Sequence, residues 1–525
     1  PLQLAAGQEC RVIQRIYQSL SQVYFGSTNI SVLFPGVQSM SSAAVSGHVG
    51  PKEASPDWKE KGRERAEHVM TAAQWINGPL NNMLQGHTPC DQSDVDHLLS
   101  DFFTARFLED KDLRNKEKEE SGPPSEPEVL PSSPVSAPTK NKKSKKSNTA
   151  EKSFPPAEPP EPVFPGSSAI GSVSLAVAKT AAKIQGTPLY KYIAALKNRT
   201  APAQFHIPVP LVTLLSCGKT CPGKLSLLEE VILIPKIITT TLELQKEMMR
   251  IMNASTKVGV REFATQAMLC DSGALAVAYE RPEQPLDLIT EACTNSGLAL
   301  GTEIHLALNC AAPELMDCSK GKYEVATGVL KSPDELVDMY QTLISKYPAV
   351  VALIDPFRRE DIDQWEKLSN GIGDSCSLLS DLTFKSKAPP LPGVRGHILK
   401  HIHETTVSDL ICITSDHQGN RGGGSLSIHL YFHASWFLCC PPPPQAVGLG
   451  LDYVKLGGLS GAERMAKYNR MISIEEELDQ QGILGRFFFL MVQGDREHIS
   501  LSLCVCVGCE RKLCVRNHTN VYLCV

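Results

Sequence analysis

Short β-rich runs alternate with amphipathic helical patterns over most of the second half of the chain, from about Ile207 to Leu478. The runs EVILIP, EIHLALN, VVALIDPF and DYVKLGG are typical of buried strands, whereas TLELQKEMMRIMNAS and SPDELVDMYQTLISKYP carry apolar residues at helical spacing. Such alternation is typical of parallel sheets, whose neighbouring strands are joined by helical crossovers. The sequence therefore predicts an α/β fold with a parallel sheet closed as a barrel.

The amino-terminal part is helical in pattern from about Arg63 to Phe107, and its composition then changes sharply. Charged residues are followed by Pro and Ser, and then by the basic run KNKKSKK at 140–146. This stretch buries too little apolar surface to offset the entropy of ordering, so we predict a disordered insertion over 109–165. The basic run also fits a nuclear address, although a solvated linker is the simpler interpretation.

The overall composition limits the class of protein. A length of 525 residues allows two or three domains of about 100–200 residues each. No run of about 18 apolar residues could span a membrane, and the net charge of −5 argues against general nucleic-acid binding. The 17 cysteines are an odd number, and Cys270, Cys310 and Cys412 stand singly in apolar surroundings. That usage favours reduced thiols and the cytosol.

Two segments, 427–445 and 486–525, are rich in Cys, aromatic residues or Pro and fit no element of the predicted barrel. The second segment holds a C-x-C-x₂-C-x₄-C series, whose members are Cys504, Cys506, Cys509 and Cys514. Structural zinc sites usually show paired C-x₂-C spacing, which this series lacks. We therefore interpret 486–525 as an atypical Cys-rich tail rather than a zinc site.

The segment VKLGGLSGAERMAKYNRMISIEEEL, at Val454–Leu478, reads as a strand, a glycine turn and a helix. Ser460 and Glu463 have the spacing of a capping box. The segment resembles the carboxy-terminal signature of the enolase family, whose substrate-binding lysine stands at the position of Lys455. A second stretch from Ser168, SAIGSVSLAVAKTAAKIQGTPLYKYIAAL, resembles the part of enolases that completes their amino-terminal domain.

The resemblance implies an enolase-like, two-domain fold. Its α+β amino-terminal domain would comprise 1–108 and 166–205, interrupted by the insertion at 109–165. An eight-stranded α/β barrel would occupy 206–485, before the tail at 486–525. The family dehydrates 2-phosphoglycerate, a small phosphorylated three-carbon acid, to phosphoenolpyruvate in glycolysis. Magnesium would be the cofactor, the cytoplasm the location, and a homodimer or a heteromer with other enolases the assembly, with neither nucleic acid nor membrane as partner.

Three site residues of the family have counterparts here. Lys400, in ILKHIHETTVSDL, stands where the family has its catalytic base. Glu230, in LLEEVILIP, matches a glutamate that contacts the substrate or its leaving hydroxyl, and Lys455 matches the second active-site lysine. Without the resemblance, each could equally be a solvated or structural charge. The resemblance implies that Lys400 acts as the base and that Glu230 and Lys455 contact the substrate.

The metal-ligand positions are substituted. Carboxylates hold magnesium in this family, since that hard cation prefers oxygen anions. Here LNCAAPE, LIDPF and SDLTF put Asn309, Ile354 and Ser380 at the three ligand positions. The neighbouring acids Asp355 and Asp381 are poor replacements, because successive strand side chains point to opposite faces. We therefore expect weak magnesium binding.

Two loops also depart from the family pattern. Cys221 stands where a loop histidine is expected, and Ser272 where an acidic partner is expected. The H-x-H-E series at 401–404 could suggest a metal site, but no partner pattern accompanies it, so ordinary polar residues are the simpler interpretation.

Two functions follow from these observations. The first is an enolase-type carbon–oxygen lyase that keeps its base but has an impaired metal site and weak activity. The second is a non-catalytic structural protein of the enolase fold, since the nearest resemblance is to a divergent branch of the family associated with the sperm tail and its flagellum. A nuclear role would rest on the basic run at 140–146 alone. Magnesium binding discriminates between the first two functions.

Overall fold

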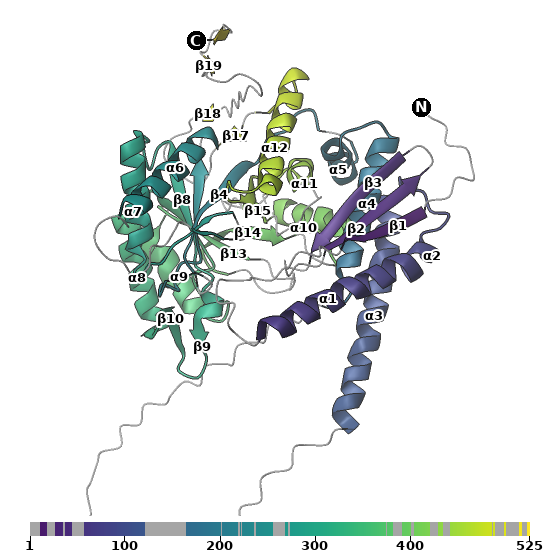
Figure 1. Cartoon of the computed structure of the whole chain (residues 1–525), viewed down its shortest axis with the longest axis horizontal. Coiled ribbons are helices and arrows are strands. Elements are labelled where there is room, and N and C mark those ends of the chain that lie inside the picture. The colour runs from purple at the N-terminus through teal and green to yellow at the C-terminus, as the bar shows by residue number, and fades with distance from the viewer. Residues whose placement is uncertain are drawn as a thin grey trace, which may run out of the picture.

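The barrel predicted from the sequence is present in the computed structural model (Figure 1). Its strands are hydrogen-bonded in the order β16-β15-β14-β13-β12-β8-β5-β4, and a further pairing of β16 with β4 closes the ring. They are β4 (Val209–Ser216), β5 (Glu230–Pro235), β8 (Ile304–Asn309), β12 (Val350–Ile354), β13 (Ser377–Asp381), β14 (Val394–Lys400), β15 (His429–His433) and β16 (Tyr453–Gly457). The predicted α/β barrel is therefore confirmed.

The structure describes most of the chain, and the structural statements below refer to that part. The described residues are 11–17, 27–34, 37–44, 57–120, 164–200, 202–218, 221, 223–235, 238–255, 268–270, 273–373, 375–381, 391–400, 404–419, 429–433, 442–485, 487–488, 498–499, 514–516 and 522–524.

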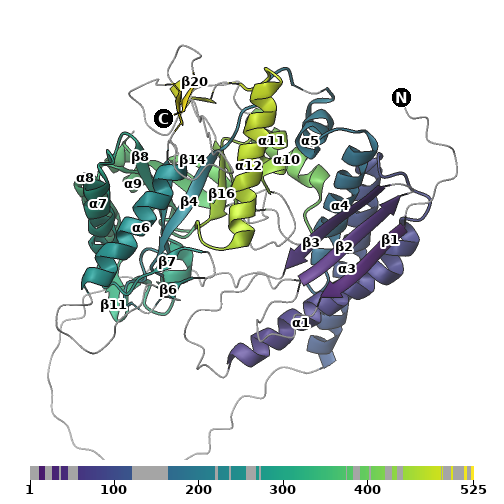
Figure 2. The ribbon, with the colours of Figure 1, turned by 45° about the horizontal axis from the view of Figure 1, so that its top comes forward.

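Helices cover the outside of the barrel (Figure 2), and two separate apolar cores result. The core inside the ring contains only strand residues, among them Ile232, Ile354 and Leu379. The core between strands and helices includes Leu378 and Trp365. Because successive strand side chains point to opposite faces, these two memberships show which residues face the barrel interior. The covering helices are α6 (Ile238–Ser255), α7 (Glu283–Ser296), α8 (Pro333–Lys346), α9 (Ile362–Ile372), α10 (Val407–Gly419), α11 (Pro442–Leu449) and α12 (Ala462–Gln480).

One strand runs against the predicted parallel direction. β5 is antiparallel to both of its neighbours, β4 and β8. The link from β4 to β5, CGKTCPGKLSLLE, carries two Gly and one Pro and no helical apolar pattern, so it does not supply the crossover helix that a parallel pair needs. As a result Glu230, the first residue of β5, pairs with Ser216 and Asn309, the last residues of β4 and β8.

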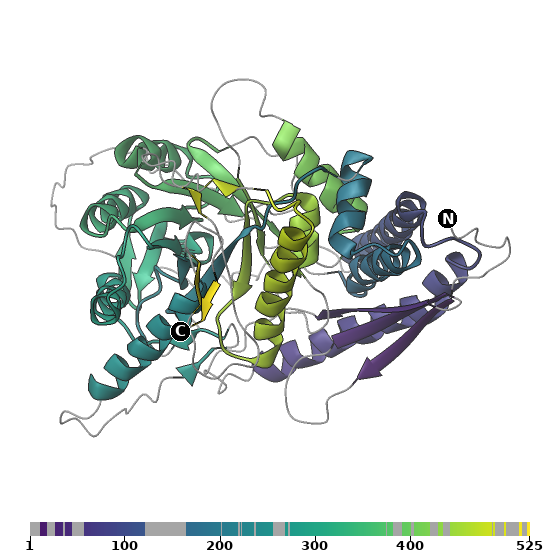
Figure 3. The same cartoon turned by 90° about the horizontal axis from the view of Figure 1, so that it is seen from above.

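The amino-terminal part has the predicted α+β character. An antiparallel sheet of β1 (Arg11–Tyr17), β2 (Ser27–Phe34) and β3 (Val37–Ala44) lies against helices (Figure 3). Helix α4 (Ser168–Ile184) contacts β2 and β3 and is buried over nearly its whole length. The other elements are α1 (Asp57–Trp75), the π-helix η1 (Ile76–Leu80), α2 (Asn81–Met83), α3 (Gln92–Glu120) and α5 (Leu189–Asn198).

Helix α3 is longer than the sequence analysis predicted. Residues 109–120, which were assigned to the disordered insertion, form its last turns. Their charged side chains are good helix formers, and adding residues to an existing helix costs much less than nucleating one. Residues 121–163, with the basic run at 140–146, lie outside the described residues. The rest of the insertion and the division into domains therefore stay predictions.

The segment 427–445 does contain barrel elements, contrary to our prediction. Residues His429–His433 form β15, which pairs with β14 and β16, and α11 begins at Pro442. The sequence HLYFH is rich in aromatic residues, which favour strands, and the neighbouring Cys and Pro residues obscured this signal. The composition of the flanks was therefore a poor guide to the strand between them.

The predicted capping box of the last long helix is also wrong. Helix α12 begins at Ala462, its N-cap is Gly461, and no side chain caps it. Ser460 lies one residue too early for a cap, and its Oγ instead accepts a hydrogen bond from Gln245 Nε2 at 3.2 Å. The Ser460 hydroxyl, which local spacing had assigned to the helix N-terminus, is therefore hydrogen-bonded to α6 instead.

In the tail, the structure describes only short strands. They are β17 (Phe487–Phe488), β18 (His498–Ile499), β19 (Cys514–Arg516) and β20 (Tyr522–Cys524). The cysteines considered above for a zinc site cannot be compared with the structure. Cys504, Cys506 and Cys509 lie outside the described residues, and the side chain of Cys514 lies outside them too. Among the described helices, none combines the length and the apolar character needed to cross a bilayer.

Candidate active site at the barrel mouth

An ion pair between Glu230 and Lys455 lies at the mouth of the barrel. Lys455 Nζ donates to Glu230 Oε2, and the two side chains are only 10% and 12% exposed. Each stands two residues from a member of the interior core, Ile232 and Tyr453 respectively, so both face the interior. The structure thus brings together two residues, distant in sequence, that the resemblance assigned to one site.

Asn309, the last residue of β8, lies beside this pair. Its Nδ2 donates to Glu230 Oε2 and to Glu229 Oε2, at 3.1 Å in each case. The backbone N of Glu229 donates to the Asn309 carbonyl at 2.8 Å, which fixes the two segments to each other. A neutral amide can donate to two carboxylates at once, which an aspartate could not. Sequence reasoning missed Glu229, whose only signal was the doubled glutamate in LLEEV.

The three predicted ligand positions do not share one face. Ile354 ends β12, belongs to the interior core and is 3% exposed; Asn309 faces the same interior. Ser380 follows Leu379, an interior residue, so strand alternation places Ser380 on the side of the helices. Its Oγ is buried and has no hydrogen-bond partner among the described residues. The structure therefore brings two of the three positions together, and not the third.

Asp355 does not take over the role of a ligand at Ile354. Its φ of 47° lies in the left-handed region, which Asp tolerates better than most residues. Burial, and then the negative charge of Asp355, raise the pKa of Cys310 to about 12, although a hydrogen bond with Tyr340 lowers it. Cys310 and Tyr340 belong to the core between strands and helices, which favours that side for Asp355. The side chain of Asp381 lies outside the described residues.

Lys400, the predicted base, is the last residue of β14. Its backbone pairs with His433 of β15, which pairs in turn with Lys455 of β16. This register places Lys400 at the same end of the barrel as the ion pair. Its side chain lies outside the described part of the chain, so its role as a base stays a prediction. The residues His401 and His403 also lie outside the described part.

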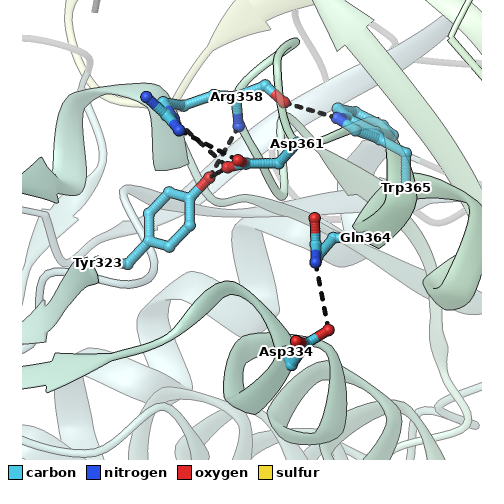
Figure 4. A network of polar contacts seen from close by, with 6 residues as sticks. All are labelled: Tyr323, Asp334, Arg358, Asp361, Gln364 and Trp365. Atoms are coloured by element: carbon cyan, nitrogen blue, oxygen red, sulfur yellow. Dashed lines mark hydrogen bonds and ion pairs between the residues drawn. The ribbon is translucent and has the colours of Figure 1, made fainter. Parts of the chain in front are cut away.

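A buried polar network holds the segment that follows Ile354 and Asp355 (Figure 4). The Arg358 guanidinium donates to Asp361 Oδ1 at 3.1 Å and Oδ2 at 3.3 Å, and Tyr323 Oη donates to the same carboxylate. Trp365 Nε1 donates to the Arg358 carbonyl at 2.9 Å. The network joins β10 (Lys322–Ala326) to α9 and so keeps one rim of the mouth in place.

The amino-terminal part holds the start of α10. Ser408, in the first turn of α10, donates to Asp96 Oδ2 through its backbone N at 2.9 Å and its Oγ at 2.7 Å. Val407 N donates to Ser174 Oγ at 2.9 Å. Burial raises the pKa of Asp96, against these hydrogen bonds, which lower it. Residues from α3 and α4 thus accept hydrogen bonds from the first two backbone N–H groups of the helix that follows the strand of Lys400.

The donor set at the mouth does not fit magnesium. Among the described residues, no three His, Cys, Asp or Glu are grouped as a metal site requires. Asn309 turns its donor nitrogen toward the two glutamates, and Ile354 offers no donor at all. Magnesium usually takes one or two carboxylates in octahedral geometry. Glu230, the buried carboxylate at this point, already pairs with Lys455.

The fold is that of an α/β-barrel protein of the enolase type, with one antiparallel strand, and a Glu–Lys pair lies at its mouth. Comparison with known proteins agrees: residues 204–388 match the family model "Enolase, C-terminal TIM barrel domain". The chain is 45% identical over 439 residues to "Enolase 4" of Danio rerio, covering 79% of this chain and 73% of that protein. The chain belongs to the enolase family.

Further relatives place the chain within the family. It is 42% identical over 467 residues to "Enolase 4" of Homo sapiens, covering 81% of this chain and 73% of that protein. It is 30% identical over 319 residues to "Enolase" of Methanopyrus kandleri, covering 60% and 72% respectively. The chain is thus related to the Enolase 4 proteins, and the resemblance to a divergent branch of the family is confirmed.

Proposed function

We propose that this chain is an enolase-type carbon–oxygen lyase of low turnover, which acts on 2-phosphoglycerate or a similar phosphorylated three-carbon acid. The observation that carries the proposal is the Glu230–Lys455 ion pair at the barrel mouth. Active sites of α/β barrels lie at the carboxy-terminal ends of the strands, and this pair lies at that end of the ring. Lys400, at the end of β14, completes the set.

Each of these residues has a part in the proposed reaction. Lys400 takes the proton from the carbon next to the substrate carboxylate, which is the role of a general base. Lys455 supplies positive charge to the resulting enolate, and Glu230 contacts the hydroxyl group that leaves. In the structure Lys455 already neutralises Glu230, so substrate has to compete for that charge. This competition is one reason to expect slow turnover.

The second reason is the metal. Bound magnesium supplies several kcal/mol of charge stabilisation to the enolate in this chemistry. The residues at the family's ligand positions do not fit that ion here, so no step in this chain is assigned to it. The family relation keeps magnesium as the cofactor to be tested.

A second function is favoured by one observation. Ile354 packs with apolar strand residues in the interior core, at a position where the family needs an anion. An apolar side chain at the position of a metal-binding carboxylate is what we would expect of a non-catalytic protein of the enolase fold. We infer that such a protein would serve in an assembly, as a homodimer or with another enolase subunit, in the cytoplasm or the flagellum.

Formation of phosphoenolpyruvate from 2-phosphoglycerate discriminates between the two functions. In the presence of magnesium, we expect turnover at least about a hundredfold below that of an intact enolase, since the lost stabilisation is worth several kcal/mol. Lys400→Ala should abolish the residual turnover if the lyase proposal is right. Robust magnesium-dependent turnover of the unmodified chain would show that the ligand positions are assigned wrongly, and turnover indifferent to Lys400 would favour the non-catalytic protein.

Restoring carboxylates should restore magnesium binding. In the variant Asn309→Asp with Ile354→Glu, two anions would face the interior beside Glu229 and Glu230, and we expect magnesium to raise the thermal midpoint of the variant but not of the unmodified chain. Adding Ser380→Asp should give no further gain, because that position lies on the side of the helices. A further rise in affinity with Ser380→Asp would contradict our assignment of faces.

A further inference from the structure

Glu229 lies at the barrel mouth, and the proposed reaction gives it no part. It stands directly before β5, next to Glu230, and its side chain is half-buried. Asn309 Nδ2 donates to Glu229 Oε2 and to Glu230 Oε2, at 3.1 Å in each case, so one amide group links the two carboxylates. The Glu229 carboxylate is therefore held beside the ion pair of Glu230 with Lys455.

The backbone of Glu229 is fixed between two strands of the barrel. Its N donates to the Asn309 carbonyl at 2.8 Å, and its carbonyl accepts a hydrogen bond from Cys217 N at 2.9 Å. A Cβ added at the neighbouring Gly218 would lie 3.1 Å from Glu229 Cα and 3.1 Å from its Cγ, so the side chain packs against this loop. A glutamate on an open surface can rotate away from an approaching anion, whereas these contacts keep the charge of Glu229 at the mouth.

A fixed charge acts on a ligand in proportion to the charge of that ligand. An acid that binds to Lys455 lies close to the Glu230 carboxylate, which pairs with the same ammonium group. The bonded oxygens of Glu229 and Glu230 share one donor atom and are at most twice 3.1 Å apart. This separation is smaller than the screening length of about 8 Å at physiological ionic strength. The charge of Glu229 is therefore felt by an acid bound at Lys455.

We propose that Glu229 is a specificity-determining residue, which lowers the affinity of the mouth for phosphorylated acids more than for hydroxy acids with a single negative charge. The inference rests on the proposed function, because it takes the mouth to be the place where the acid binds. At pH 8 2-phosphoglycerate carries about three negative charges, since the second pKa of a phosphate ester is about 6. Glycerate carries one. The stronger repulsion of 2-phosphoglycerate is a third reason for slow turnover.

A purely structural role of Glu229 leads to a different expectation. If its carboxylate only held Asn309 in place, replacement of Glu229 would change the binding of all acids by the same factor. A charge effect instead grows with the charge of the ligand and shrinks as salt is added. The dependence on ligand charge therefore separates the two roles.

Calorimetric titration of the full chain at pH 8, in EDTA so that no metal takes part, tests the proposal. Compared with the unmodified chain, Glu229→Gln should bind 2-phosphoglycerate about tenfold more tightly and glycerate about twofold more tightly, because we expect a factor of about two for each ligand charge. The gain for 2-phosphoglycerate should fall when potassium chloride is added. The glutamine oxygen can still accept the hydrogen bond of Asn309 Nδ2, so the link between the segments is kept.

Two matched variants serve as controls. Glu229→Asp keeps the charge and should bind 2-phosphoglycerate as weakly as the unmodified chain does. Glu303→Gln removes an exposed charge directly before β8, at the end of that strand opposite to Asn309, and should also leave the affinity unchanged. Glu303 Oε2 accepts a hydrogen bond from Ala299 N at 2.9 Å, which a glutamine oxygen can accept as well. If Glu229→Gln does not fold, Glu229→Ala removes the same charge and replaces it in the comparison.

Three results would overturn the proposal. Equal gains for 2-phosphoglycerate and glycerate would show that Glu229 has a structural role only. A similar gain with Glu303→Gln would show that the net charge of the chain is responsible. Absence of 2-phosphoglycerate binding by Glu229→Gln at millimolar concentration would show that the mouth does not take this anion. None of these readouts uses turnover, so a chain without lyase activity can still confirm the role of Glu229.

Discussion

Replacement of Lys455 by methionine is expected to lower the free energy of unfolding by about 3–5 kcal/mol, because Glu230 would keep its charge in a buried place without a cation. The side chains of the pair are 12% and 10% exposed for Glu230 and Lys455, so solvent offers little compensation. Methionine has nearly the length of lysine, which keeps the loss of packing small. Urea denaturation at neutral pH measures the change.

A double variant separates charge from packing. Glu230→Gln in the Lys455→Met background removes the buried charge, and the new amide would still offer an oxygen to Asn309 Nδ2, which donates to the Glu230 carboxylate at 3.1 Å. We expect most of the lost stability to return, because replacing a whole buried pair is often close to neutral. If the double variant is no more stable than Lys455→Met alone, the ion pair is not the source of the loss.

The second large effect concerns Glu475 on α12, which is 7% exposed. Burial, and then the charges of Asp479 and Glu476, raise its pKa from 4.5 to about 8. Below pH 4.5 the carboxyl is neutral in the folded and the unfolded chain, so Glu475→Gln should not change stability there. As pH rises, the unfolded chain releases this proton first, and the folded chain loses stability until the pH passes about 8.

At pH 9 we therefore expect Glu475→Gln to be more stable than the unmodified chain by about 5 kcal/mol, since the pKa rises from 4.5 to about 8 and each pKa unit corresponds to about 1.4 kcal/mol. Denaturation midpoints at acid and alkaline pH give the comparison. Glu476→Gln is the matched control, because Glu476 is exposed and its replacement should have a small effect at both pH values. Equal gains for both variants would point to net charge rather than burial.

Sequence reasoning predicted the barrel because apolar strand runs and helical patterns reflect burial directly. It did not predict the direction of β5, although the Gly and Pro residues of the link carried that signal. It also missed β15, since composition on either side of HLYFH obscured five strand residues. The capping box failed for a different reason. Ser460 had the right spacing, but Gln245 of another helix takes its hydroxyl.

For the candidate site, too, some features were predicted from the sequence and others required the structure. The resemblance pointed to Glu230, Lys455 and the substituted positions Asn309 and Ile354, because the short sequence motifs around these strand ends still match those of the family. It could not assign Ser380 to a face, since that depends on which neighbours lie in the interior core. Lys400 was placed in register by backbone pairing with β15, a strand that the sequence analysis did not recognise.

The sequence by itself determined that strands and helices alternate, and its resemblance to the enolase family predicted a site with two lysines, a glutamate and three substituted ligand positions. Local periodicity and residue identity are enough for such statements. Only the tertiary structure decided that Asn309 donates to two glutamates and that Glu230 and Lys455 neutralise each other. These contacts join residues far apart in the chain, and their existence depends on barrel closure and strand direction, which no local pattern encodes.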